Sequence, residues 1–377
     1  MKFAPFLTCL MALPAISTAD ESMSDAWERF NDWSIGDVLF PNLHLHGTGG
    51  MSSGEVAELA TGGHDPRRES FSAQAIEPGV SLRTEYLEGF ANYLWFQDAD
   101  GDWDGEWEEA FGKITNIPGG LELKGGQYLS RFGTLNDKHL HAWDFVDSDL
   151  VLSRFLGDDG LLLRGGEVSW TPSFASGPAF TAVFSLGYGK ARPHEHGHDH
   201  EDEDHEEEHF DGEEAALKDD ILTARTMGRY RYNDFHSVTA GVSWAGGENG
   251  FERDTHVLGI DAEYLWRDVD AYDVHMEPTG PEIHEGSYRE WGFYSHAIYT
   301  WHQRLDTGLR LGWVEGVDDF GQSERFRISP VASWWFDDSR RIGLRAQYNY
   351  DALAGHEDEH SLWLQLKIAL GNTEEVR

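Results

Sequence analysis

The chain has 377 residues, of which 68 are Asp or Glu and 29 are Lys or Arg, so its formal net charge is −39. This charge excludes nucleic acid as a partner, because nucleic-acid binding needs a cationic surface, and it favours cation accumulation or simple solubility. No stretch of the mature chain approaches the roughly 18 consecutive apolar residues of a membrane helix, which excludes a helical membrane protein but not a membrane β-barrel.

The first nineteen residues have the three parts of a secretory signal peptide. Met1-Lys2 is a short positive region, residues 3–16 are apolar but too few to span a bilayer, and Ser17-Thr18-Ala19 places small residues before Asp20. We therefore predict cleavage after residue 19. The sole cysteine, Cys9, lies in the removed segment, so the mature chain can form no disulfide and no thiolate metal site.

Residues 20–40 differ from the rest of the chain. Trp27, Phe30 and Trp33 recur at helix-like spacing between charged residues. This pattern predicts a short periplasmic amphipathic helix or arm.

Residues 41–370 alternate between apolar and polar side chains, as the strands of a β-barrel do. Leu362, Leu364 and Leu366, for example, share one face, and Trp363 and Gln365 share the other. Strand lengths near ten residues and an Arg-rich second face favour an all-β, porin-like transmembrane antiparallel barrel with a wet lumen over a soluble sandwich. We expect about sixteen strands, at 40–47, 71–84, 86–97, 105–114, 121–130, 160–171, 178–189, 220–232, 235–245, 254–266, 270–277, 288–302, 305–314, 324–336, 340–350 and 360–370. Residues 371–377 are expected to form a C-terminal tail.

The orientation of the barrel follows from the lengths of its connections. Bacterial outer-membrane barrels have an even number of strands, short periplasmic turns and long external loops. With sixteen strands, every long segment becomes external, at 48–70, 98–104, 131–159, 190–219, 246–253, 278–287, 315–323 and 351–359. The side chains expected to face the outer-membrane lipid include Leu309, Leu311, Ile342, Leu344, Leu362, Leu364, Leu366 and Ile368.

The loop at 131–159 carries the motif His-x-His-x-Trp-Asp-Phe-Val-Asp from His139 to Asp147. With the flanking runs LELKGGQYLSRFG, RFLGDDG and EVSW, this segment resembles a bacterial family of porin-like barrels often labelled zinc-regulated outer-membrane receptors, more distantly akin to phosphate-selective porins. The resemblance implies zinc-linked uptake, with functional weight on His139, His141, Asp144 and Asp147. The alternative is that the aromatic and apolar residues of the loop only pack together, and that its polar residues only form the hydrogen bonds the loop needs. Asp149 stands where the family pattern has proline.

Members of that family are sometimes called TonB-dependent, which the length of the chain argues against. Plugged transporters have about 22 strands, and at roughly 10 residues each these would use about 220 residues. The remainder of the mature chain cannot hold both a plug and the loops. A porin-sized barrel is expected instead.

The segment from Pro193 to His209 is rich in metal-ligand side chains, with six His and nine Asp or Glu among seventeen residues. Imidazole and carboxylate are ligands of Zn²⁺, and a cluster of them suits capture of zinc or another divalent transition metal. The alternative is a solvated acidic loop. A second His/acid hairpin near the C-terminus is expected on the same rim. The predicted external ligands are His194, His196, His198, His200, His205, His209, His356 and His360.

The face opposite the lipid stripe carries a row of cations, namely Arg225, Arg229, Arg231, Arg310, Arg325, Arg327, Arg345 and Lys367. Rings of Arg and Lys select anions, as in a phosphate-type porin. Asp261, Glu263 and Glu290 are expected on the same face, so the row could instead be internally paired.

No Gly-x-Ser-x-Gly, His-Glu-x-x-His or phosphate-loop motif is present, and we expect no enzyme activity. The sequence predicts an outer-membrane channel or receptor for uptake or capture of metal ions, zinc foremost. The alternatives are an anion-selective porin and a surface metal-capture protein that its barrel anchors. The expected partners are small solutes and the lipid bilayer, with room for a homo-oligomer.

Overall fold

A computed structural model describes residues 33–53, 62–98, 101–157, 160–192, 216–233, 235–267, 271–283, 289–301, 303–316 and 323–372. The predicted signal peptide, most of the segment 20–40, the His-rich run from His194 to His209 and most of the tail 371–377 lie outside these ranges. Among the described helices, none has the length and apolar content needed to cross a bilayer.

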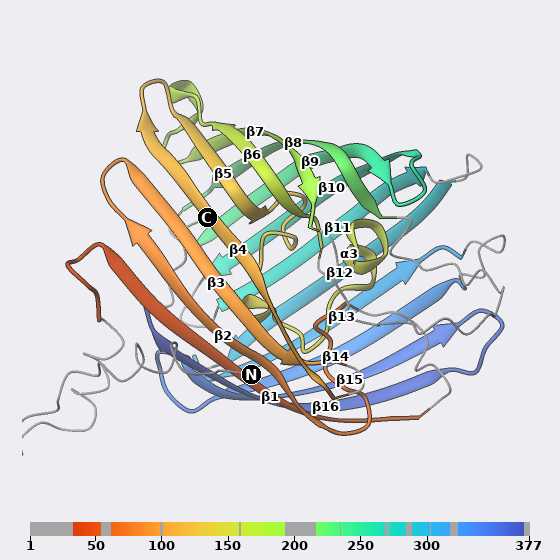
Figure 1. Cartoon of the computed structure of the whole chain (residues 1–377). Coiled ribbons are helices and arrows are strands. Elements are labelled where there is room, and N and C mark those ends of the chain that lie inside the picture. The colour runs from red at the N-terminus through yellow and green to blue at the C-terminus, as the bar shows by residue number, and fades with distance from the viewer. Residues whose placement is uncertain are drawn as a thin grey trace, which may run out of the picture.

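The described chain forms one closed antiparallel barrel of sixteen strands (Figure 1). Each strand pairs with its neighbours in sequence, and the ring closes where β1 pairs with β16, from Asn42 opposite Gly371 to Ser53 opposite His360. The strands are β1 (Leu39–Ser53), β2 (Phe71–Arg83), β3 (Leu87–Gln97), β4 (Trp103–Ile117), β5 (Leu121–Leu129), β6 (Leu162–Trp170), β7 (Phe180–Ala191), β8 (Leu217–Arg231), β9 (His236–Asn249), β10 (Asp254–Arg267), β11 (Ala271–Ile283), β12 (Arg289–Trp301), β13 (Leu305–Val314), β14 (Arg325–Trp335), β15 (Ile342–Leu353) and β16 (Glu359–Gly371). All sixteen overlap the predicted strands.

The outer wall of the barrel is apolar, as a membrane requires. Leu362, Leu364 and Leu366 are 46%, 51% and 41% exposed, whereas Trp363 and Gln365 between them are buried in the lumen. The other side chains predicted to face lipid are exposed or partly exposed, namely Leu309, Leu311, Ile342, Leu344 and Ile368. The prediction of the lipid face is confirmed.

Several predicted external loops are too long because the strands continue further, most of all at β1 and β11. β1 runs through the predicted loop start at 48–53, where Gly50 lets the Arg67 carbonyl and the Trp363 ring approach closer than a Cβ atom would allow. β11 continues to Ile283 through a proline-containing stretch, and its register shifts between Thr279 and Glu282. Such an irregularity is where a strand can accommodate proline.

The connection between β5 and β6 is the main departure from a simple barrel. This segment, residues 130–161, contains the 3-10 helix η2 (Leu140–Ala142) and the helix α3 (Leu150–Leu156), and it folds into the interior (Figure 1). We call it the constriction loop. Asp149, which stands where proline was expected, caps α3 by accepting a hydrogen bond from the backbone N–H of Val151 at 2.9 Å.

Apolar side chains of the constriction loop form a buried cluster against β8, β9 and β10, while α3 packs on β12 and β13. Members of the cluster include Phe132, Val151 and Phe155 from the loop and Ile221, Ala245 and Val257 from the strands. The predicted wet lumen therefore accounts for only part of the interior. Part of the interior is a conventional hydrophobic core, because α3 has to bury its own apolar face.

Candidate functional site

Two β-bulges turn carboxylates into the lumen beside the constriction loop. In β4 the register with β3 shifts between Asn92 and Tyr93, so Glu108 is an extra residue, and the consecutive residues Glu108 and Glu109 are both buried. The register between β1 and β2 shifts between His46 and Gly47 of β1. On β2, Glu77 lies opposite His44 and is also buried, facing the lumen. A bulge redirects side chains in this way because it interrupts the strict alternation of faces.

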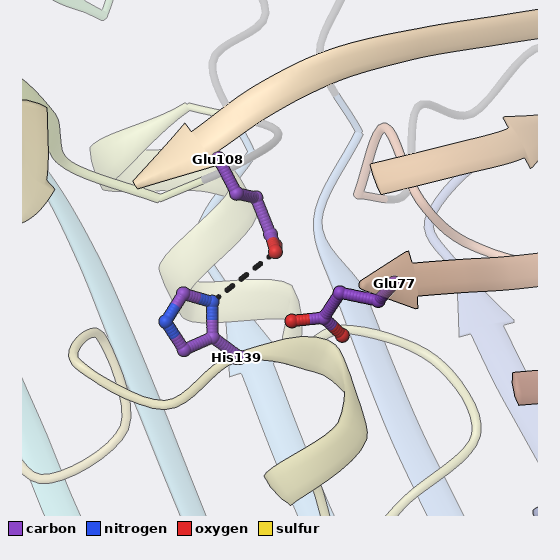
Figure 2. Close-up of side chains that lie close together, drawn as sticks. All are labelled: Glu77, Glu108 and His139. Carbon is purple, nitrogen blue, oxygen red and sulfur yellow. Dashed lines mark hydrogen bonds and ion pairs between the residues drawn. The ribbon is translucent and has the colours of Figure 1, made fainter. Parts of the chain in front are cut away.

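The ring of His139 lies between these carboxylates. Its Nδ1 is 3.2 Å from Glu108 Oε2, and its Nε2 is 2.8 Å from Glu109 Oε2. Glu77, Glu108 and His139 can each offer one ligand atom, and these three atoms lie within 4.8 Å of one another. Figure 2 shows the three side chains converging from β2, β4 and the constriction loop.

Neighbouring polar groups hold the carboxylates in place. The Asn92 side-chain amide donates to Glu77 Oε1 at 2.7 Å and to Glu108 Oε2 at 2.5 Å. The backbone N–H of Leu129 donates to Glu109 Oε1 at 2.5 Å. The orientation of all three acids is therefore fixed by second partners, as is usual for groups that bind a cation.

Three further imidazoles adjoin the cluster. His141 Nδ1 is 2.9 Å from Glu77 Oε2, and the His141 ring stacks on His44 with centroids 3.8 Å apart. His46 follows on the same face of β1, is 3% exposed, and has a buried Nδ1 without a hydrogen-bond partner among the described residues. We call His44, His46, His139, His141, Glu77, Glu108 and Glu109 the His/Glu cluster.

Sequence reasoning identified two members of this cluster and missed five. His139 and His141 come together as expected. His44 and His46 could have been found, because the run Leu43-His44-Leu45-His46 puts both imidazoles on the polar face of a strand. The three glutamates could not have been found, since their orientation depends on bulges that the residue pattern does not reveal.

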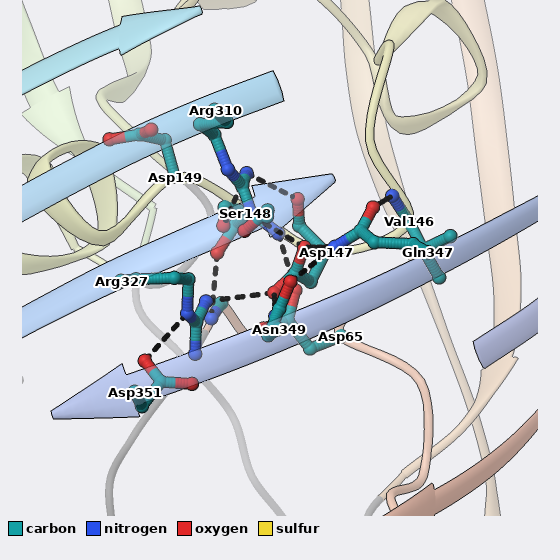
Figure 3. A network of polar contacts seen from close by, with 12 residues as sticks. Asp65, Val146, Asp147, Ser148, Asp149, Arg310, Arg327, Gln347, Asn349 and Asp351 are labelled. Carbon is teal, nitrogen blue, oxygen red and sulfur yellow. Dashed lines mark hydrogen bonds and ion pairs between the residues drawn. The ribbon is translucent and has the colours of Figure 1, made fainter. Parts of the chain in front are cut away.

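Asp147, which was expected near His139 and His141, lies in a different network (Figure 3). Its Oδ1 accepts from Arg310 Nη2 at 2.6 Å, and its Oδ2 accepts from Arg327 Nη1 at 2.7 Å and from Asn349 Nδ2 at 2.7 Å. Gln347 also donates to it. Asp147 therefore attaches the constriction loop to β13, β14 and β15, and it is not one of the residues that could share a metal with His139.

Half of the predicted lumen cations are internally paired. Arg225 forms a two-point ion pair with Asp261, at 2.8 and 2.7 Å. Arg325 and Arg327 both bind Asp351. The predicted alternative, that the row of lumen cations is internally paired with acids, thus holds for these residues and for Arg310.

The other four lumen cations have no carboxylate at ion-pair distance within the described ranges. Arg229 donates to the Thr239 hydroxyl at 3.1 Å and is exposed, as is Arg231 near the end of the same strand. Arg345 and Lys367 are buried and bind backbone carbonyls of the constriction loop.

Two predicted external ligands can be placed. His356 is exposed in the turn between β15 and β16. His360 lies on the outer wall, where its Nδ1 is 2.5 Å from the Tyr348 hydroxyl. Asp144, predicted for the inner site, borders a cavity beneath the constriction loop with Arg345 and Lys367.

Comparison with known proteins identifies the architecture. No family model matches the chain. An uncharacterized protein of Aquifex aeolicus (strain VF5) is 31% identical over 309 residues, which cover 75% of this chain and 61% of that protein. The chain thus spans less than two thirds of the length of this relative.

Solved structures of outer-membrane proteins superpose on most of the barrel. The anion-selective porin of Comamonas acidovorans has a TM-score of 0.57 at 10% identity, covering 88% of this chain and 99% of that one. OmpF of Salmonella typhi, in complex with daunomycin, has a TM-score of 0.55 at 12% identity, covering 89% and 99%. The chain has the porin fold. This confirms the predicted porin-like β-barrel, and the barrel has sixteen strands, not the about 22 of plugged transporters.

Proposed function

We propose that this protein is an outer-membrane porin-like channel for divalent transition-metal ions, zinc foremost, and that the His/Glu cluster is its selective constriction. The observation that carries the proposal is the convergence of His139 with Glu77, Glu108 and Glu109 in the lumen, next to a loop that narrows it. The porin fold supports passage of small solutes.

The chemistry of the cluster suits a borderline dication. Imidazole nitrogen and carboxylate oxygen bind Zn²⁺ at about 2.0–2.2 Å, so tetrahedral ligand atoms lie roughly 3.4 Å apart. Glu77, Glu108 and His139 span up to 4.8 Å, so the cluster has to contract around an ion. An incompletely formed site is appropriate for a cargo, which must bind well enough to enter and weakly enough to leave.

The His-rich segment from His194 to His209 remains a prediction from the sequence. In this proposal it concentrates cations ahead of the constriction by mass action, as many weak ligands would. One similar solved structure, OmpT of Vibrio cholerae folded in vitro, is a trimer form, and we extend the expectation of a homo-oligomer to this chain on that basis alone. We also propose that the protein acts as a channel and not as an enzyme.

The test uses the purified full-length protein in planar bilayers with a zinc gradient. We expect discrete conductances, a reversal potential that indicates zinc permeation, and a wild-type channel that zinc occupies at low concentration. His139→Ala should weaken zinc occupancy roughly 10- to 100-fold, the range seen even when a supporting group of a metal site is removed. His256→Ala is the matched control and should behave like wild type, because this exposed imidazole lies on the outer face of β10 and stacks on Trp244.

Two results would overturn the proposal. Permeation by chloride or phosphate without zinc would favour the anion-selective alternative. A folded barrel with no conductance would favour a surface metal-capture protein, with the barrel serving only as an anchor.

A further inference from the structure

Two polar cavities lie directly beneath the constriction loop, toward the end of the barrel that carries the short turns. One has a volume of about 310 Å³ and the other about 250 Å³, and both are bordered by His141, Trp335, Arg340 and Lys367. They therefore adjoin each other around His141 and Lys367. The larger cavity is also bordered by His44 and His46, so it reaches the imidazoles of the His/Glu cluster.

The cavity walls hold two buried cations that form no direct ion pair among the described residues, although the charges of Asp144 and Asp306 act on both. Lys367 Nζ donates to the His141 carbonyl at 2.8 Å, and Arg345 donates to the carbonyls of Phe145 and Trp143 at 2.9 Å each. Within the described ranges, neither cation has a carboxylate at ion-pair distance. Burying a cation without an opposite charge is costly, so an anionic group that entered these cavities would be stabilised.

The remaining charges around the cavities do not cancel this excess. Asp306 is already bound by Arg340 and by the Trp335 indole, whose Nε1 lies 2.7 Å away. Arg341 borders the larger cavity; its guanidinium donates to the Gly371 carbonyl at 2.7 Å, while its backbone N–H donates to Asp337. Asp144 is the remaining acid that borders either cavity. The region beneath the loop is thus net cationic, in contrast to the acidic His/Glu cluster above it.

An imidazole also faces this region without a partner. His46 is 3% exposed, borders the larger cavity, and has a buried Nδ1 that accepts or donates no hydrogen bond within the described structure. An unsatisfied buried nitrogen is a cost unless a ligand completes it. Metal ligands and anion-binding cations therefore border the same cavity.

We infer that the cargo is a divalent metal bound to a small polycarboxylate, with the metal held by the His/Glu cluster and the free carboxylates of the chelator held by Lys367 and Arg345. This inference rests on the proposed metal-channel function and specifies its substrate. A bare dication leaving the cluster would meet the repulsion of Lys367, Arg345 and Arg341. A chelate with a net negative charge would be attracted to these residues instead, so one path accommodates both halves of the complex.

The test measures binding by equilibrium dialysis of the full-length protein with three probes: Zn²⁺ alone, citrate alone, and Zn²⁺ with citrate at the same free Zn²⁺ concentration. Wild type should bind the zinc–citrate complex more tightly than either component. Lys367→Met should weaken binding of the complex roughly tenfold, as expected for loss of a hydrogen bond to a charged group, and should leave binding of Zn²⁺ alone unchanged or improved. Lys113→Met is the matched control, because this lumenal lysine pairs with Glu88 at 2.8 Å and borders neither cavity.

The outcomes separate the two claims. If Zn²⁺ alone binds to wild type but citrate adds nothing and Lys367→Met has no effect, the inference is wrong and the metal channel stands. If neither Zn²⁺ nor its complex binds, the proposed function fails as well. If citrate binds equally with and without metal, and His139→Ala does not matter, the cavity is an anion site alone. Should Lys367→Met fail to fold, Arg341→Gln, at a partly exposed position on the larger cavity, tests the attraction of the cationic cavity for the chelate and should weaken binding of zinc–citrate but not of Zn²⁺ alone.

Discussion

Asp147 connects the constriction loop to the barrel wall, and the charged groups around it determine the strength of this connection. The side chain is 1% exposed and its two oxygens bind Arg310 and Arg327. Burial alone would raise the pKa of this carboxyl, but the two guanidinium groups and the amides of Gln347 and Asn349 outweigh that effect and hold its pKa well below the usual range. The carboxylate therefore stays ionised in the folded protein.

Asp147→Asn should release the constriction loop. The substitution leaves the buried guanidinium of Arg310 without its counter-charge, while Arg327 keeps Asp351. Removing one partner of a buried ion pair typically costs about 3–5 kcal/mol. We expect faster proteolytic cleavage between residues 130 and 161 of the folded barrel, together with a larger and noisier conductance. Asp338→Asn, which removes an exposed partner of Arg304, is the control and should change neither. Equal protection of the loop in both variants would contradict this role of Asp147.

The pH dependence of the same attachment has a definite sign. A carboxyl with a lowered folded-state pKa contributes stability above its unfolded pKa, near 3.9 for aspartate, and loses it only as the pH falls through the folded value. The loop should therefore remain protected from an acid-active protease such as pepsin at about pH 4, where an ordinary aspartate is half protonated. Release of the loop in wild type between about pH 5 and pH 4 would show that the ion pairs do not dominate.

At the scale of elements, the bulge in β4 determines whether the His/Glu cluster exists. Trp107 points outward and is 51% exposed, while Glu108 and Glu109 both point inward. Asn92 pairs with Glu109 and Tyr93 pairs with Trp107, so Glu108 has no residue opposite it in β3. Removing Glu108 should join two regular stretches of strand without turning any other side chain to the wrong face.

Deletion of Glu108 should give a folded barrel with the same zinc affinity as Glu108→Ala. Deletion of Gly112, in a regular stretch of the same strand where it pairs with Gly89, should prevent assembly, because a one-residue slip exchanges the lipid and lumen faces. The readout is the heat-dependent gel mobility that marks a folded membrane barrel. A barrel that survives the Gly112 deletion but not the Glu108 deletion would refute this account of the bulge.

At the scale of the whole molecule, ion binding in the lumen should stabilise the barrel. β2, β4 and the constriction loop each contribute a ligand, so bound metal links elements that separate on unfolding. A ligand that binds only the native state adds about 2.7 kcal/mol at a concentration of 100 times its Kd. The structure therefore predicts that global stability reports on occupancy of the cluster.

Zn²⁺ at about ten times its wild-type Kd should raise the thermal unfolding temperature of wild type at pH 7.5 and should raise that of His139→Ala much less. The shift should diminish below about pH 6.5, because ligating imidazoles must be neutral. Calorimetry of the detergent-solubilised protein checks both effects, with Ca²⁺ as the ionic control. An equal shift with Ca²⁺, or in His139→Ala, would mean that cations act on the acidic surface and not at the cluster.

The sequence by itself determined the barrel and its lipid-facing side. A period of two places Leu362, Leu364 and Leu366 on one face whatever surrounds them, and an even strand number assigns the long segments to one end. The His139–Asp147 motif also marked the loop that bears the candidate site. These features are local, so they can be read from the order of residues.

Only the tertiary structure decided which side chains meet. Glu108 and Glu109 share a face because of a bulge that forms against β3, and Asp147 leaves the neighbourhood of His139 because Arg310 and Arg327 compensate its buried charge from distant strands. Whether a lumen cation binds a carboxylate or a backbone carbonyl likewise depends on how the constriction loop folds inward. Burial and charge pairing depend on residues far apart in the chain, which is why the residue pattern alone left those alternatives open.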